Sequence, residues 1–339
     1  MAIRVFLVGF GNVGRSLGKI LLSNPPIPEI EVAGVANSKG GVLVEGPADR
    51  AQLARLLNSG ERLEKHPSFR PGLGPVEGAV VSGANVAMIT IPPSYETGEP
   101  NRTIYYGLVG EEISIITADK TVLALDYNGI IRESRNRCLF LGYRATVAAG
   151  TPALDSARGL KGRGIERIRA VLNASTNYIL GLVEEGYTYE EAVRKAVQAE
   201  LAEPNPRIDL EGYDPAAKLA ILANTLGYEA SLNDVERVPL TSIPEDEVYK
   251  ARRKGGRVKY VAYADFTKGV LRVEPQIVDS RDPLASAVGE ENVIVFQLES
   301  TSIVLRGPAG PAWRTAKVMV TDLLEYSERL EEAGLCGCP

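Results

Sequence analysis

Histidine and cysteine are scarce in this chain. Its 339 residues include one histidine, His66, and three cysteines. This argues against a histidine triad or a histidine-rich metal centre, and it leaves proton transfer to Lys, Asp, Glu or Tyr. Three cysteines do not make a disulfide framework, which favours a reduced, cytoplasmic setting. We expect Cys336 and Cys338 to be free thiols in a loosely held terminus, with a disulfide between subunits as the alternative.

The chain also lacks a surplus of positive charge and a long apolar run. Lys and Arg number 38 against 43 Asp and Glu, a net charge of -5, which argues against nucleic acid as a partner. The longest charge-poor stretch, residues 78–95, contains Gly, Asn, Ser and two prolines. It predicts a buried strand and a loop rather than a membrane span. The N-terminus enters a strand pattern at once, so no signal peptide is expected.

What the chain does contain is an ordinary globular composition, with 45% apolar and 24% charged residues, and a length that suits two domains. Its first part alternates strand and helix patterns, and this alternation predicts an α/β domain with a parallel sheet covered by helices. The expected strands are residues 3–8, 31–36, 86–91 and 113–117, the expected helices are 15–22, 47–58 and one between the last two strands, and 60–78 is expected to be loop.

From about residue 145 the pattern changes. Strand-like runs at 168–172, 258–265, 270–277, 293–298 and 302–305 predict an α+β domain with a mixed or antiparallel sheet. Two helices interrupt them. Thr188 to Glu191 forms a capping box before the first, and Asp214 followed by Pro215 predicts the N-cap of the second, which ends at Gly227. A last helix is expected over residues 315–330.

A glycine motif links the first strand to the first helix. Gly9, Gly11 and Gly14 fit the pattern G-x-G-x-x-G. The glycines allow a tight turn and a close backbone approach to a pyrophosphate, above the positive end of a helix dipole. In this strand–turn–helix setting the motif predicts a Rossmann-type, doubly wound dinucleotide-binding domain. The alternative is a glycine turn that binds no ligand.

The second strand ends without the acidic residue that an NAD site usually offers to the ribose hydroxyls. It continues instead into Asn37, Ser38 and Lys39. Ser38 and Lys39 are suited to a 2′-phosphate, so we expect NADP to bind at least as well as NAD. The alternative is that Lys39 is simply solvated in a polar turn.

Four carboxylates crowd into a Pro-rich loop just before an apolar helix. They are Glu203, Asp209, Glu211 and Asp214, and the helix carries one lysine, Lys218. Such a density of like charge needs compensation, and a cationic group of a substrate is one candidate. Asp214 and Lys218 are four residues apart and so lie on one face of the helix.

Taken together, these motifs resemble homoserine dehydrogenase, a family that interconverts L-homoserine and L-aspartate 4-semialdehyde with NAD(P). The resemblance covers nearly the whole chain, and its most specific part is Glu-Pro-x-Pro-x-x-Asp-x-x-Gly-x-Asp-x-x-x-Lys over residues 203–218. The other parts are Glu-Thr-Gly-Glu-Pro at 96–100, Thr-Ala-Asp-Lys at 117–120, Ala-Thr-Val-Ala-Ala-Gly-Thr-Pro at 145–152, residues 173–180, Asp-Pro-Leu-Ala at 282–285 and Thr-Ala at 315–316.

The resemblance implies a dinucleotide-binding domain at 1–143, a catalytic and dimerisation domain at 144–305, and a C-terminal helix at 306–339 that returns to the first domain. It also implies a homodimer. Lys120 and Lys218 are the expected catalytic residues. The expected substrate-binding residues are Glu203, Asp214, Ser175 and Asp209, and the expected cofactor-binding residues are Gly9, Gly11, Asn12, Val13, Gly14, Arg15, Asn37, Ser38, Lys39, Thr90, Ile91, Pro92, Lys120 and Gly310.

Elementary chemistry agrees with these roles. Hydride addition to an aldehyde makes an alkoxide, and a charged lysine supplies both a cation and a proton. Ordinary roles are the alternatives: Asp214 as a helix cap only, Lys218 as a surface ion pair, and Lys120 as a solvated residue at the end of a strand.

The chain departs from the family pattern at several positions. Ala174 and Leu201 stand where glycine and tyrosine are usual, and Ala309 and Pro311 alter a glycine-rich run. Pro311 has no N–H for a cofactor. Arg144 stands where many relatives have a glutamate that helps hold a monovalent cation, so we expect no metal ion. A non-catalytic or drifted NADP-binding paralogue, with a sensory role or another amino alcohol as substrate, is the alternative function.

Overall fold

The computed structural model describes residues 2–202 and 205–336, with side chains described as far as residue 332. The chain forms two compact units. The first comprises residues 1–146 and 310–339, and the second comprises residues 147–309.

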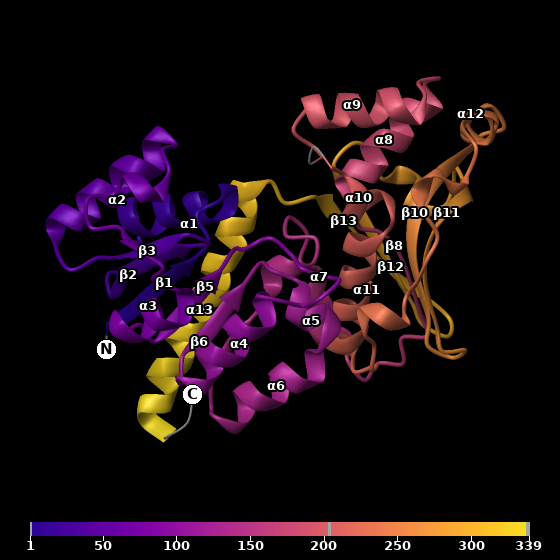
Figure 1. The fold of residues 1–339 in the computed structure, drawn as a ribbon. Coiled ribbons are helices and arrows are strands. Elements are labelled where there is room, and N and C mark those ends of the chain that lie inside the picture. The colour runs from indigo at the N-terminus through magenta and orange to yellow at the C-terminus, as the bar shows by residue number, and fades with distance from the viewer. Residues whose placement is uncertain (1, 203–204, 337–339) are drawn as a thin grey trace. The chain divides into compact units, whose positions relative to one another are not determined.

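The first unit is built on a seven-stranded sheet in the order β4-β3-β2-β1-β5-β6-β7 (Figure 1). Its parallel strands are β1 (Ile3–Val8), β2 (Ile30–Asn37), β5 (Val86–Ile89), β6 (Ser114–Thr117) and β7 (Leu141–Gly142). Two antiparallel strands, β3 (Gly40–Leu43) and β4 (Arg70–Pro71), extend one edge. The predicted α/β class with a Rossmann-type parallel sheet is confirmed.

Helices pack on both faces of this sheet. Val5 and Leu7 of β1 lie in one core with residues of α1 and α13, whereas Phe6 points to the other face, against Gly78 of α3. The helices of this unit are α1 (Asn12–Ser23), α2 (Pro47–Ser59), η1 (Leu63–Lys65), α3 (Pro75–Val81), α4 (Asn101–Gly110), α5 (Thr121–Leu125), α6 (Tyr127–Asn136), η2 (Arg144–Thr146) and α13 (Ala312–Cys336). Residues 60–78 are therefore not all loop, because they include η1, β4 and the start of α3.

The second unit contains a six-stranded mixed sheet in the order β13-β12-β8-β10-β11-β9. The strands are β8 (Arg167–Val171), β9 (Glu236–Arg237), β10 (Gly256–Asp265), β11 (Val270–Asp279), β12 (Glu291–Gln297) and β13 (Ser302–Pro308). All neighbours pair antiparallel except β9, which runs parallel to β11. The prediction of an α+β unit with a mixed sheet is confirmed.

The second unit also contains helices, and the predicted first residue of one of them is wrong. The helices are α7 (Ala153–Leu160), α8 (Ala174–Glu184), α9 (Tyr189–Gln198), α10 (Arg207–Leu210), α11 (Tyr213–Leu226), η3 (Leu232–Asp234), η4 (Leu240–Ser242), α12 (Glu245–Arg253) and η5 (Pro283–Ser286). The Thr188–Glu191 capping box of α9 is confirmed. The N-cap of α11, however, is Gly212 rather than Asp214, although Gly227 ends the helix as predicted. Asp214 lies inside the first turn, so its carboxylate is available for other partners.

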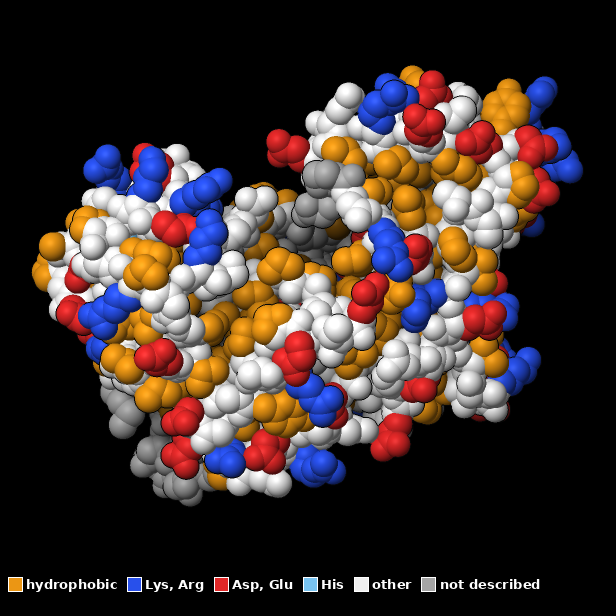
Figure 2. All heavy atoms as spheres, viewed as in Figure 1, with side chains coloured by type: hydrophobic (Ala, Val, Ile, Leu, Met, Phe, Trp, Pro, Cys, Tyr) orange, Lys and Arg blue, Asp and Glu red, His pale blue; other side chains and the backbone are white. Residues whose placement is uncertain are grey.

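Three further features complete the description. Cys138, after α6, is disulfide-bonded, and the chain's other cysteines, Cys336 and Cys338, have side chains outside the described residues. Within the described ranges, no helix combines the length and apolar character needed to cross a bilayer. Figure 2 shows acidic and basic side chains interspersed on the viewed face of each unit.

Candidate active site

Asn173 organises a polar cluster where β8 gives way to α8. It is the N-cap of α8, and its side-chain oxygen accepts a hydrogen bond from the backbone N–H of Thr176 at 2.9 Å. This bond orients the amide, so that its NH₂ group faces away from the helix. The NH₂ group donates to Asp209 at 2.7 Å and to Asp214 at 2.9 Å. One cap residue thus joins two carboxylates from two other helices.

Lys218 is held on the same cluster from α11. Its Nζ lies 2.6 Å from Oδ2 of Asp214, one turn earlier, and donates to the backbone oxygen of Leu172 at 2.6 Å. The side chains of Lys218 and Asp214 are only 15% and 13% exposed. An ion pair this sheltered is held more rigidly than the exposed surface pair that was the alternative.

The turn before α11 explains how Asp209 and Asp214 come together. Gly212 has φ 81°, and a Cβ at this position would lie 2.5 Å from the hydroxyl of Tyr260. Glycine is therefore needed on both conformational and steric grounds. The resulting tight turn brings α10 and α11 round so that Asp209 and Asp214 both reach Asn173.

The carboxylates influence each other electrostatically. Burial, followed by the negative charge of Asp214, raises the pKa of Asp209, while hydrogen bonds to Ser175 and Asn173 and the charge of Lys218 oppose this rise. Such mutual effects between acids are typical of functional clusters, and they also occur in structural ones.

Ser175 is buried, at 3% exposure, in the first turn of α8. Its hydroxyl lies 2.6 Å from Oδ2 of Asp209 and 2.8 Å from Oδ1 of Asn173. The structure thus groups three of the predicted substrate-binding residues with Lys218. The fourth, Glu203, lies outside the described residues.

In the first unit, the glycine motif forms a close-packed turn. A Cβ on Gly14 would lie 2.3 Å from the backbone oxygen of Gly9, and one on Gly9, where φ is 111°, would lie 2.7 Å from Oγ1 of Thr90. Gly11, in contrast, has open space where its Cβ would stand. It is the N-cap of α1 and offers no capping side chain. Backbone N–H groups at an open helix N-terminus fit the pyrophosphate of a dinucleotide.

Of the residues that follow Gly11, some are exposed at this opening and others lie toward the interior. Asn12 is exposed and Val13 is half-buried. Arg15 donates to the backbone oxygen of Leu56 at 3.1 Å and also to that of Glu61, and its guanidinium lies over the ring of Phe10. Burial lowers the pKa of Arg15. This arginine therefore ties α1 to the end of α2.

At the end of β2, the polar turn is organised by Asn37. Its side-chain oxygen accepts hydrogen bonds from the N–H groups of Lys39 and Gly40, at 2.9 and 3.2 Å. Ser38 and Lys39 are exposed. Lys39 also pairs with Glu64 of η1 at 2.8 Å, and the hydrogen bond from Lys39 lowers the pKa of Glu64. An acid therefore does stand beside β2, but it comes from residues distant in sequence.

Lys120 follows β6 and occupies the N-cap position of α5, where it is partly buried. Its neighbour Asp119 is 2% exposed and accepts hydrogen bonds from the N–H and hydroxyl of Thr121. Burial raises the pKa of Asp119, and its second oxygen has no hydrogen-bond partner among the described residues. Among the other predicted cofactor contacts, Ile91 is half-buried and Pro92, exposed, accepts a hydrogen bond from Asn101.

The chain departs from the family pattern at Ala309 and Pro311, which lie just before the C-terminal helix α13. The carbonyl of Gly310 accepts a hydrogen bond from Thr315 at 3.1 Å, and the carbonyl of Pro311 accepts from the N–H groups of Arg314 and Thr315. Pro311 therefore stands just before a helix, where a missing N–H costs the helix nothing. Ala309 lies just before this turn and donates its N–H to the carbonyl of Glu290.

Arg144 is paired with α13. Its guanidinium lies 2.6 Å from Oδ1 of Asp322 and also pairs with Glu325. Its backbone N–H donates to Oδ2 of Asp322 at 3.0 Å. Asp322 is 0% exposed. Within the described ranges, no group of three or more His, Cys, Asp or Glu side chains is arranged to hold a metal ion.

Sequence reasoning missed Asn173 and Glu64. Asn173 had a usable signal, since Asn is a favoured N-cap and it directly follows a strand. Glu64 had none, because only the tertiary fold brings η1 beside β2.

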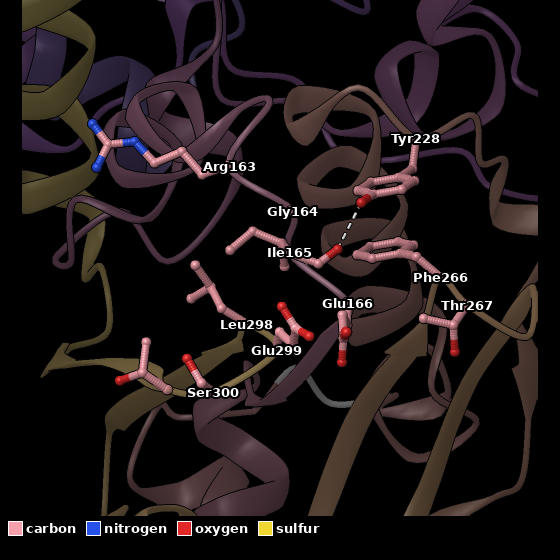
Figure 3. Close-up of a pocket in the computed structure, with 11 residues that line it drawn as sticks. Arg163, Gly164, Ile165, Glu166, Tyr228, Phe266, Thr267, Leu298, Glu299 and Ser300 are labelled. Carbon is pink, nitrogen blue, oxygen red and sulfur yellow. Dashed lines mark hydrogen bonds between the residues drawn. The ribbon is translucent and has the colours of Figure 1, made fainter.

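A cavity of about 480 Å³ lies elsewhere in the second unit (Figure 3). Its wall includes the stacked rings of Tyr228 and Phe266, with centroids 3.8 Å apart, and the hydroxyl of Tyr228 donates to the carbonyl of Ile165 at 2.6 Å. None of the predicted site residues lines it.

Comparison with known proteins adds independent information. The sequence model of the family described as homoserine dehydrogenase matches residues 152–324. A homoserine dehydrogenase from Sulfurisphaera tokodaii is 30% identical over 95% of this chain and 97% of its own length. An NAD(+)-dependent homoserine dehydrogenase from Pseudomonas canavaninivorans is 28% identical, covering 96% of each chain. The structure of a mutant hyperthermophilic archaeal homoserine dehydrogenase in complex with NADPH is 26% identical, with a TM-score of 0.82 over 97% of this chain and 98% of that one.

Proposed function

This chain belongs to the homoserine dehydrogenase family of NAD(P)-dependent oxidoreductases acting on CH–OH groups, and we propose that it interconverts L-homoserine and L-aspartate 4-semialdehyde. The observation that carries the proposal is the sheltered Lys218–Asp214 pair, fixed at 2.6 Å on the Asn173 cluster. A lysine held in this way can donate a proton to one defined atom of a substrate.

Lys218 is the proposed proton donor in the reduction. A nicotinamide cofactor, when bound, would supply the hydride. The carbonyl oxygen that becomes an alkoxide must receive a cation and a proton. Two hydrogens of the Lys218 ammonium face Asp214 and the carbonyl of Leu172. An ammonium group has three donors, and we assign the third to the substrate oxygen. In the oxidative direction the same nitrogen accepts the hydroxyl proton.

The amino-acid end of the substrate is assigned to the acidic loop. We assign its α-ammonium to Glu203, with Asp209 and Ser175 completing the polar wall and Asp214 orienting Lys218. Lys120 is the proposed second catalytic lysine, positioned at the start of α5 beside the buried Asp119.

The first unit is the proposed cofactor domain and the second the proposed catalytic and dimerisation domain. The opening at Gly11 and the uncapped start of α1 fit a dinucleotide. NADP is the proposed preference, because Ser38 and Lys39 are exposed at the end of β2. The carboxylate of Glu64 opposes a 2′-phosphate, so we expect the preference to be modest. The relatives support both cofactors, since one is NAD(+)-dependent and another is in complex with NADPH.

Other parts of the proposal concern assembly and ions. A homodimer formed through the second unit is supported by exposed apolar side chains on its strands, among them Val270, Ile277 and Val304. Light scattering will give the molar mass. Arg144 is the proposed substitute for a bound cation, which predicts activity independent of added sodium or potassium. A cytoplasmic location, where NAD(P) pools serve biosynthesis, is proposed for the same function and is tested by cell fractionation.

The decisive experiment measures homoserine-dependent reduction of NADP at high pH. Lys218→Ala should lose about 100-fold or more in kcat while keeping its affinity for NADPH. Lys250→Ala is the matched control, because Lys250 makes the same i,i+4 pair with Asp246, at 2.5 Å, but with side chains 62% and 64% exposed. Its kcat should equal that of the wild type. A wild type that binds NADPH but turns over neither substrate would instead favour a non-catalytic or drifted paralogue.

A further inference from the structure

A single buried hydroxyl, that of Thr121, joins three segments of the first unit. Its Oγ1 donates to Oδ1 of Asp119 at 2.8 Å. It accepts hydrogen bonds from the backbone N–H of Ser94 at 2.9 Å and from the side-chain NH₂ group of Asn101 at 3.1 Å. A hydroxyl has one hydrogen and two lone pairs, so these three bonds use its full capacity. Thr121 therefore connects the turn after β6 with the loop after β5 and the start of α4.

Asn101, the buried first residue of α4, extends this connection to Pro92. Its NH₂ group donates to the backbone carbonyl of Pro92 at 3.0 Å as well as to Thr121. A carbonyl can only accept, so this bond fixes the orientation of the amide. Burial raises the pKa of Asp119, and the polar groups of Thr121 and Asn101 oppose the rise. The loop after β5 is thus held at two points, the carbonyl of Pro92 and the N–H of Ser94.

The residues on either side of Lys120 are fixed by hydrogen bonds of their own. Asp119 accepts from the N–H of Thr121 at 3.1 Å, and its own N–H donates to the hydroxyl of Thr117 at 2.9 Å. The hydroxyl of Tyr105, on α4, donates to the carbonyl of Asp119 at 3.3 Å and lies beside the hydroxyl of Thr117. All four of these neighbours are at most 2% exposed. The backbone from which the Lys120 side chain extends is therefore held on both sides.

We propose that Thr121 and Asn101 are positioning residues, which hold the Lys120 turn and the loop at residues 92–94 as one rigid body. The cofactor contacts expected at the end of β5 and the catalytic group expected at Lys120 then cannot shift relative to each other. A displacement of about 1 Å between reacting groups can cost about 100-fold in rate, so this rigidity matters for turnover. The role of Lys120 rests on the function proposed above, whereas the rigid connection itself does not.

Two substitutions of Thr121 test the role of its hydroxyl. Thr121→Val removes the hydroxyl and keeps the branched shape of the side chain. It should lower kcat by about 10-fold or more and weaken NADPH binding, because Ser94 and Asn101 then lose their common acceptor. Thr121→Ser keeps the hydroxyl, so its kcat should stay within about twofold of the wild type. If Thr121→Ser lost as much activity as Thr121→Val, packing of the methyl group would be responsible and the proposal would be wrong.

Ser114→Ala is the matched control, at the opposite end of the same strand, β6. Ser114 is 4% exposed, and its hydroxyl accepts a hydrogen bond from the N–H of Phe140 at 3.2 Å. Its removal also deprives a backbone N–H of its acceptor, but far along the strand from Lys120. Ser114→Ala should lower the melting temperature and leave kcat unchanged when assayed well below the transition. An equal fall in kcat for Ser114→Ala and Thr121→Val would mean that lost stability, rather than lost positioning, reduces turnover.

Hydrogen–deuterium exchange of the full-length protein separates this proposal from the proposed reaction. The amide of Ser94 donates to Thr121, so the segment at residues 92–95 should exchange faster in Thr121→Val than in the wild type or Ser114→Ala. Unchanged exchange there would overturn the rigid connection, whether or not the protein oxidises homoserine. A wild type without turnover, combined with faster exchange in Thr121→Val, would contradict the proposed reaction and still support the connection.

Discussion

Replacing Arg144 by methionine should destabilise the first unit, because it leaves a buried charge without its main partner. Asp322 is 0% exposed and Arg144 is 17% exposed in their side chains. The substitution keeps most of the side-chain volume and removes the guanidinium, which also pairs with Glu325. The backbone N–H of residue 144 would still donate to Asp322, as it does now at 3.0 Å.

The expected magnitude follows from this geometry. Removing one partner of a buried ion pair typically costs about 3–5 kcal/mol. We expect about 3 kcal/mol, the lower end, since the backbone donor remains and Glu325, 24% exposed in its side chain, can turn to water. For a unit of this size, a loss of about 3 kcal/mol lowers the melting temperature by about 6–12 °C.

Calorimetry or circular dichroism will measure this shift in the transition of the first unit. Arg70→Met is the matched control, because the Arg70–Glu45 pair, at 2.7 Å, is 47% and 66% exposed and should be worth less than about 1 kcal/mol. Adding Asp322→Asn to Arg144→Met should recover more than half of the loss, since the buried charge is then gone. A decrease below about 2 °C for Arg144→Met would refute the reasoning, because a desolvated carboxylate that has lost its guanidinium partner cannot cost so little.

The ion pair between Arg144 and Glu325 should make the stability of the protein depend on pH in the acid range. Burial by itself would raise the pKa of Glu325, but the hydrogen bond and charge of Arg144, assisted by Arg329, bring it below its ordinary value. A lowered folded-state pKa stabilises the protein above the unfolded-state value, and this contribution is lost as pH falls. The stability difference between wild type and Arg144→Met should therefore narrow in acid.

Three further predictions address other parts of the molecule. Glu64→Gln should strengthen NADPH binding relative to NADH by several-fold, because Lys39 then loses its counter-charge; unchanged dissociation constants for both would remove Lys39 from the 2′-phosphate site. Burial lowers the pKa of Lys259 from 10.5 to about 8. The free energy of unfolding should therefore rise by about 3 kcal/mol as the pH increases from about 8 to 10.5. Urea titrations in which Lys259→Met shows the same rise would contradict this. Gly212→Ala should cost about 1–3 kcal/mol, since φ is 81° and the new methyl meets the hydroxyl of Tyr260; a thermal melt within error of the wild type would show that the turn relaxes.

Local rules predicted much of the architecture but failed at the start of α11. The parallel sheet of the first unit was predictable because buried strands are continuous apolar runs and the helices between them are amphipathic. Asp214 followed by Pro215 also satisfied a local rule for helix starts. The structure places the cap at Gly212 because the turn there packs against Tyr260, a contact from residues far away in sequence.

The candidate site divides in the same way. The spacing of Asp214 and Lys218 predicted one helix face, and the pair is indeed formed at 2.6 Å. The sharing of Asn173 between Asp209 and Asp214 could not be predicted, since it joins three helices through side chains whose separation depends on packing. The Lys39–Glu64 pair shows the same limit, because η1 reaches β2 only through the fold.

The sequence by itself determined the family, the cofactor motif and the identity of the acids and lysines, because these depend on residue type and spacing along one element. The tertiary structure decided which acid faces which base and which hydroxyl is already engaged. The physical reason is that hydrogen bonds and charge interactions act over a few ångströms, and only the folded chain sets distances on that scale between residues far apart in sequence.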